Sequence, residues 1–161
     1  MKEETATFGM GCFWGVELLF SKIEGVNSAT SGYMGGDEIK YPNPTYEQVC
    51  SDESGYAEVV EVKYDSSKIS YKELLKIFFE NHNPTTLNRQ GPDFGSQYRS
   101  VIFYYSGEQK KMAEKVKKEF QDMIGKEREI VTQIVKASTF FPAEEYHQKY
   151  LEKRGVTSCH I

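Results

Sequence analysis

One cysteine stands where a strand pattern gives way to a helix pattern, between two glycines and two large aromatic residues. The stretch "GMGCFWGVELLF" places Cys12 after Gly11 and directly before Phe13 and Trp14. A thiol at the first turn of a helix lies near unpaired backbone N–H groups and the positive end of the helix dipole, and both stabilise a thiolate. Gly11 permits a sharp turn that leaves the sulfur uncovered. The pattern indicates a nucleophile, although Cys12 by itself fits a small buried hydrophobic residue equally well.

A glutamate within a strand pattern is the second candidate for chemistry. In "GYAEVVEVKYD", alternation puts Glu58 on the same face as Val60 and Val62, whereas Glu61 points the other way. If that face is buried, desolvation raises the pKa of Glu58 and keeps the carboxyl protonated, which suits a general acid. The alternative is an exposed glutamate at the start of the strand with no role, because glutamate is rarely buried.

Two tyrosines lie in or beside long loops rich in glycine, proline and asparagine. Tyr46 belongs to "YPNPTYEQVC", and Tyr98 follows "RQGPDFGSQ". Each could present a hydroxyl to a ligand, although most tyrosines pack and hydrogen-bond locally. Read without their neighbours, Phe13 and Trp14 favour a place in the core over a place in a pocket.

The elements that would position these residues follow a recognisable order. Apolar periodicity and turn residues predict strand, helix, strand, strand, helix and strand at residues 5–8, 13–24, 26–33, 57–64, 70–82 and 98–105. This order indicates an α+β fold with a ferredoxin-like split βαβ core, in which helices pack on an antiparallel or mixed sheet. The core is extended by a helix, a strand, a terminal helix and a flexible tail, predicted at residues 106–124, 129–137, 142–153 and about 154–161.

The composition limits the classes of protein to which the chain can belong. Its 161 residues, 39% hydrophobic and 27% charged, predict a single catalytic domain over residues 1–161. The interleaved charges, with a net charge of -4, favour neither nucleic acid nor membrane as a partner. The N-terminus has no apolar run, so we expect a cytoplasmic protein. The three cysteines are too scattered for a disulfide scaffold, and no ligand cluster predicts a metal.

Taken together, these motifs resemble the peptide methionine sulfoxide reductase A family. The resemblance covers the chain from Thr7 to Cys159, with "GCFWG", "NPTY", "AEVVEVKYD", "ISYKELL", "NRQGPDFGSQYRS" and "AEEYHQKYL" in family order. Two features depart from the family pattern. Members commonly have histidine where Tyr56 stands, and the tail "GVTSCHI" carries one cysteine where two are often present.

The resemblance implies a reaction centred on two thiols. Cys12 would attack the sulfur of methionine-S-sulfoxide, free or in proteins, while Phe13 and Trp14 hold its methyl group. The oxygen would pass to Cys12 and leave a sulfenic acid and methionine. Cys159 would then form a disulfide with Cys12 that thioredoxin reduces. We therefore expect a monomeric enzyme for the repair of oxidative damage, without a cofactor.

The resemblance also implies how the sulfoxide oxygen is activated. A sulfoxide sulfur becomes a good electrophile only when its oxygen is protonated or strongly hydrogen-bonded. Glu58 is the expected acid, and Tyr46 and Tyr98 are the matching hydrogen-bond donors. Asp93, in "GPDFGSQY", is expected to orient this network or the substrate backbone.

Two other classes of protein are alternatives to this hypothesis. A cysteine hydrolase would need a histidine beside Cys12, and only His82, His147 and His160 are available. A binding module with an inert thiol is a further alternative. Cys50 favours a local structural role, and His147 favours a surface or core position over contact with substrate.

Overall fold

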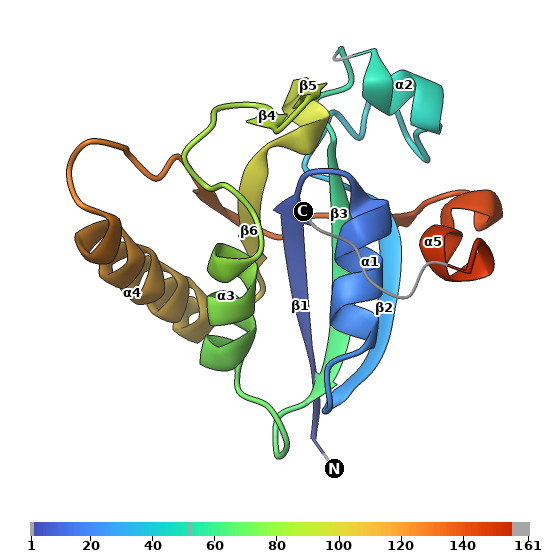
Figure 1. Cartoon of the computed structure of the whole chain (residues 1–161). Helices are drawn as coiled ribbons and strands as arrows, with labels where there is room; N and C mark the ends of the chain where they lie inside the picture. Colours follow the sequence, from blue (N-terminus) through green and yellow to red (C-terminus); the bar gives the residue numbers. More distant parts are fainter. Residues whose placement is uncertain (1, 52, 156–161) are drawn as a thin grey trace.

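A six-stranded sheet runs through the part of the chain that the structure, a computed structural model, describes, residues 2–51 and 53–155 (Figure 1). In spatial order the strands are β7 (Gln133–Lys136), β6 (Ser100–Tyr104), β1 (Glu3–Met10), β3 (Ala57–Asp65), β2 (Val26–Met34) and β8 (Phe141–Pro142). Neighbours pair antiparallel, except that β7 joins β6 in parallel. The inner order β6-β1-β3-β2 is that of a split βαβ core, so the predicted fold class is confirmed.

Three helices cover one face of this sheet: α1 (Phe13–Ser21), α3 (Tyr71–Glu80) and α4 (Gly107–Ile124) (Figure 1). At the centre of the core, Phe8 of β1 lies with its ring centroid 5.4 Å from that of Phe20 and 5.3 Å from that of Phe78. These contacts join the strand before Cys12 to the helix after it and to α3. Because large aromatic rings bury much apolar area, the turn that carries the thiol is held from both sides.

Short elements lie inside the two predicted long loops. Residues 34–50 contain α2 (Tyr46–Cys50), which a capping box between Thr45 and Gln48 begins. Residues 83–97 contain the hairpin of β4 (Arg89–Gln90) and β5 (Asp93–Phe94), followed by the 3-10 turn η1 (Ser96–Tyr98). The helix α2 has only five residues, and such a short apolar stripe leaves no periodicity for a sequence to reveal.

The single terminal helix predicted at residues 142–153 is wrong. The chain instead forms β8, the 3-10 turn η2 (Glu145–His147) and the short helix α5 (Tyr150–Lys153). Lys149 interrupts the helix with a left-handed φ of 53°. The side chain of Gln148 bonds the backbone of Ser31 on β2, so tertiary contacts outweigh local helix propensity here. The predicted tail with Cys159 lies largely outside the described residues.

Candidate active site

The turn that carries Cys12 is built by glycine and covered by the β4–β5 hairpin. Gly11 has a φ of 97°, which L side chains rarely adopt, and a Cβ there would lie 2.8 Å from Cγ of Gln90 in β4. Cys12 follows as the residue that precedes α1, and it is neither fully buried nor fully exposed. This partial exposure disagrees with the buried-hydrophobe alternative. Figure 1 shows α2 and the hairpin at the same end of the sheet as the start of α1.

Glu58 lies in β3 beside this turn and is 1% exposed. Its Oε1 accepts a hydrogen bond from the backbone N–H of Phe13 at 3.2 Å, while Oε2 has no hydrogen-bond partner among the described residues. Burial raises the pKa of Glu58 to about 8, with the Phe13 hydrogen bond opposing the shift and the charge of Asp93 adding to it. The exposed-glutamate alternative is therefore wrong. At neutral pH this carboxyl carries a proton next to the thiol-bearing helix start.

Tyr46 and Tyr98 approach the same carboxyl from two different elements. Tyr46 lies at the start of α2 and Tyr98 at the end of η1, and the two phenols are close enough to influence each other's pKa. Burial and the charge of Glu58 raise both pKa values, that of Tyr98 to about 12. Both phenols therefore stay protonated and can donate. Asp93, half-buried in β5, acts electrostatically on both Glu58 and Tyr98.

Phe13 and Trp14 form an aromatic wall with the C-terminal segment. Phe13 is 1% exposed, and its ring centroid lies 5.2 Å from that of His147. The indole Nε1 of Trp14 donates to His147 Nδ1 at 3.0 Å, and its ring stacks on Tyr150 at 3.7 Å. The ring of His147 also lies 4.6 Å from that of Tyr46. Phe13 thus belongs to the core, as the sequence favoured, whereas the side chain of Trp14 is partly exposed.

Comparison with known proteins identifies the family of this chain. The family model described as peptide methionine sulfoxide reductase matches residues 4–161. The chain belongs to that family. A relative named peptide methionine sulfoxide reductase MsrA, from Acidobacterium capsulatum, is 54% identical over 160 residues, covering 97% of this chain and 98% of its own. Family membership makes the chain an enzyme of the oxidoreductase class.

Two solved structures resemble this chain over most of its length. Mxr1 from Saccharomyces cerevisiae in reduced form is 38% identical with a TM-score of 0.91, covering 99% of this chain and 90% of that one. Mxr1 from the same yeast has also been solved in complex with Trx2. That structure is 30% identical with a TM-score of 0.65, covering 92% of this chain and 85% of that one.

The histidines of this reductase do not fit the cysteine hydrolase alternative. The Nδ1 of His82 faces the carbonyl of Phe78 and must therefore be its N–H, which leaves Nε2 to accept from the hydroxyl of Ser100. The Nδ1 of His147 accepts the N–H of Trp14. Both described histidines thus have their basic lone pair engaged, and neither is available as a base for a thiol. His160 lies outside the described residues.

Several residues at the site carry no clear signal in the sequence. His147 is buried against the aromatic wall, where the sequence favoured a surface or core place. Cys50 ends α2, and burial together with the charge of Glu58 raises the pKa of its thiol, so Cys50 borders the site. Glu144 binds both Tyr33 and the backbone of Tyr46. Only the contacts that residues make across the fold reveal these places.

Tyr56, where the family commonly has histidine, has a structural role at the start of the strand that carries Glu58. The side chain is fully buried, and its hydroxyl donates to the carbonyl of Tyr41 at 2.9 Å. Its ring meets that of Phe141 edge to face, with centroids 5.9 Å apart. The substitution therefore fastens the loop before α2 to β3 and β8.

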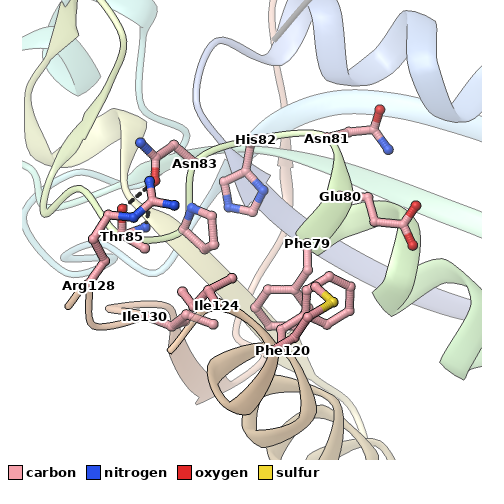
Figure 2. Close-up of a pocket in the computed structure, with 12 residues that line it drawn as sticks. Phe79, Glu80, Asn81, His82, Asn83, Thr85, Phe120, Ile124, Arg128 and Ile130 are labelled. Atoms are coloured by element: carbon pink, nitrogen blue, oxygen red, sulfur yellow. Dashed lines mark hydrogen bonds between the residues drawn. The ribbon is translucent and has the colours of Figure 1, made fainter. Parts of the chain in front are cut away.

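A separate cleft of about 800 Å³ lies between the C-terminal ends of α3 and α4 (Figure 2). Phe79 and Phe120 form part of its wall, and His82 and Arg128 lie near its polar side. Cys12 does not line it, so the cleft is distinct from the candidate active site.

Among the described residues, no group of three or more His, Cys, Asp or Glu side chains is placed to hold a metal ion, and no helix is long and apolar enough to cross a membrane.

Proposed function

We propose that this protein reduces methionine-S-sulfoxide, free or in proteins, to methionine, with Cys12 as the nucleophile. The observation that carries the proposal is the state of Glu58: a buried, protonated carboxyl bound to the N–H of the residue after Cys12. A thiol nucleophile beside a proton donor is what attack on a sulfoxide requires.

The first chemical step assigns one role to each group. The sulfur of Cys12 attacks the sulfoxide sulfur while the proton of Glu58 passes to the sulfoxide oxygen. The hydroxyls of Tyr46 and Tyr98 hydrogen-bond to that oxygen as negative charge develops on it. The oxygen then passes to the Cys12 sulfur as the sulfur–oxygen bond of the substrate and the new sulfur–sulfur bond both break. This leaves a sulfenic acid on Cys12 and releases methionine as the thioether.

The aromatic wall supports a choice between sulfoxide epimers. The sulfur of methionine sulfoxide is chiral, and an apolar contact for its methyl group on one side with oxygen donors on the other fits one hand. Phe13 and Trp14 offer the apolar side, while Glu58 and the tyrosines offer the donors. Family resemblance assigns the S-epimer to this arrangement, and Asp93 would orient the substrate.

Recycling of the enzyme requires a second thiol and an external reductant. We assign the second thiol to Cys159, which would attack the Cys12 sulfenic acid and release water to form a disulfide. Two thiols of thioredoxin would then reduce this disulfide by exchange. The solved complex of yeast Mxr1 with Trx2 supports a thioredoxin as the partner of this chain as well.

The decisive experiment compares the two epimers with wild-type protein and two variants. Wild-type protein should release methionine from the S-sulfoxide only, and Cys12→Ser should abolish release while the protein stays folded. Cys50→Ser is the matched control and should keep one-equivalent release in a single turnover. Equal rates on both epimers, or appreciable reduction by Cys12→Ser, would overturn the proposal.

A further inference from the structure

The carboxylate of Glu144 joins two elements that are distant in sequence, and one of them carries a residue of the site. Its Oε1 accepts a hydrogen bond from the hydroxyl of Tyr33 in β2 at 2.9 Å. Its Oε2 accepts one from the backbone N–H of Tyr46 at 3.0 Å. Both contacts are part-buried, so water competes less for the carboxylate than it would on an open surface.

The charge state of Glu144 suits this bridging role. Burial acts to raise its pKa, but hydrogen bonds from the N–H of Tyr46, its own N–H and the Tyr33 hydroxyl, with the charge of His147, lower it overall. Burial together with Glu144 raises the pKa of Tyr33, so that phenol keeps its proton. An ionised carboxylate therefore faces two donors, which is the stronger form of hydrogen bond.

The helix that begins with Tyr46 depends on outside contacts for its position. A helix of five residues is not stable by itself, and its first N–H groups have no partner within the helix. Thr45 accepts the N–H of Gln48, while Glu144 accepts that of Tyr46. Three residues further along the same segment, the ring of His147 packs on the ring of Tyr46 at 4.6 Å. The segment that contains Glu144 and His147 thus holds Tyr46 twice, its backbone through Glu144 and its ring through His147.

We infer that Glu144 is a positioning residue for sulfoxide reduction, fixing the backbone of Tyr46 against β2 and thereby placing the Tyr46 hydroxyl beside Tyr98 and Glu58. The inference rests on the proposed function of Tyr46 as a donor to the sulfoxide oxygen. Glu144 itself touches neither the substrate nor Cys12 in this role. Moving a catalytic group by about 1 Å can lower a rate by about a hundredfold, so the effect belongs in the chemical step.

The test is a double-mutant cycle on the rate of methionine release in a single turnover. Glu144→Gln replaces one acceptor oxygen by an NH2 group that cannot accept, and it should lower the rate about tenfold or more. The matched control is Glu145→Gln, an exposed neighbour whose ion pair with Lys153 spans 3.7 Å, and it should leave the rate unchanged. In a Tyr46→Phe background, Glu144→Gln should have little further effect, because the group that it positions is gone.

The outcomes separate the inference from the function on which it rests. A wild-type rate for Glu144→Gln, or an equal fold-loss in both backgrounds, would overturn the positioning role. A wild-type rate for Tyr46→Phe would overturn the donor role of Tyr46 and the inference with it, while failure of wild-type protein to release methionine would overturn the function itself. If Glu144→Gln does not fold, Tyr33→Phe removes the other anchor. Tyr33→Phe should then lower the rate in the wild-type background but not in the Tyr46→Phe background. A wild-type rate for Tyr33→Phe, or an equal fold-loss in both backgrounds, would again overturn the positioning role of Glu144.

Discussion

In the proposed mechanism, the chemistry of this reductase depends on one carboxyl group that keeps its proton. Glu58 lies on the core face of β3, so burial moves its pKa from an ordinary carboxyl value to about 8. Within the part of the chain that the structure describes, its Oε2 has no hydrogen-bond partner, which leaves one oxygen of the group available to a substrate. The neighbouring charge of Asp93 strengthens the same shift. A glutamate in this setting is a general acid at neutral pH, whereas an exposed one is a base.

The pH dependence of the first step should report this carboxyl directly. The acid form of Glu58 exists below its pKa, so the single-turnover rate should fall as pH rises through about 8. Glu58→Gln keeps the volume but lacks a transferable proton, and it should lower the rate by about 10²- to 10⁴-fold and remove that descending limb. Rapid-quench measurement of methionine across pH checks both results.

The control for this experiment lies on the same strand. Glu61 projects to the opposite face of β3, so Glu61→Gln should leave the rate and its pH profile unchanged. A rate loss of less than about tenfold for Glu58→Gln would contradict general acid catalysis by this residue.

At the scale of elements, the turn between β1 and α1 decides where the thiol lies. The turn needs the positive φ of Gly11. It also needs a residue without a Cβ, because the side chain of Gln90 in the hairpin packs closely against this position. Gln90 in turn bonds the backbone N–H of Asn83 through its side chain, which fixes the hairpin after α3. Backbone conformation and hairpin packing therefore set the position of Cys12 together.

Gly11→Ala should disturb stability and activity together. A left-handed residue with a Cβ costs roughly 1–2 kcal/mol, and the clash with Gln90 adds to it. We expect a lower free energy of unfolding in urea and a slower single-turnover rate, because the turn moves the thiol. Gly107→Ala, at a site with open space and no positive φ, should change stability by less than about 1 kcal/mol and leave the rate intact. Equal free energies of unfolding for the two variants would contradict the prediction, because a side chain at residue 11 would then cause no strain in the turn.

At the scale of the whole molecule, the site gathers residues from almost the full length of the chain. Glu58 comes from a strand of the sheet and Cys12 from the turn between β1 and α1. Tyr46 and Tyr98 come from segments that connect the strands, and His147 comes from the C-terminal segment. The proposed cycle adds a residue from beyond that segment and a second protein. Reduction of substrate and regeneration of the enzyme therefore depend on different parts of the chain and can be separated by mutation.

Cys159→Ser should make that separation visible. The variant should still release one equivalent of methionine at the wild-type rate, because Cys12 and the acid are untouched. It should then stall with thioredoxin, whereas dithiothreitol, which is small enough to reach a sulfenic acid directly, should restore much of the turnover. Mass spectrometry of wild-type protein after one turnover should find Cys12 linked to Cys159. A link to Cys50, with Cys159→Ser fully active on thioredoxin, would move the recycling role to Cys50.

The sequence by itself determined the order of the core elements and the first residues of the candidate site. Alternation and helical periodicity are local properties, so they predicted the sheet face of Glu58 and the helix that starts after Cys12. Motif resemblance added Tyr46, Tyr98 and Asp93. Only the tertiary structure decided that the face of Glu58 is buried, because burial depends on what packs against a strand. It also decided that residues 142–153 do not form one helix and that Glu144 and His147 reach Tyr46, since contacts between residues about 100 positions apart leave no pattern within either segment.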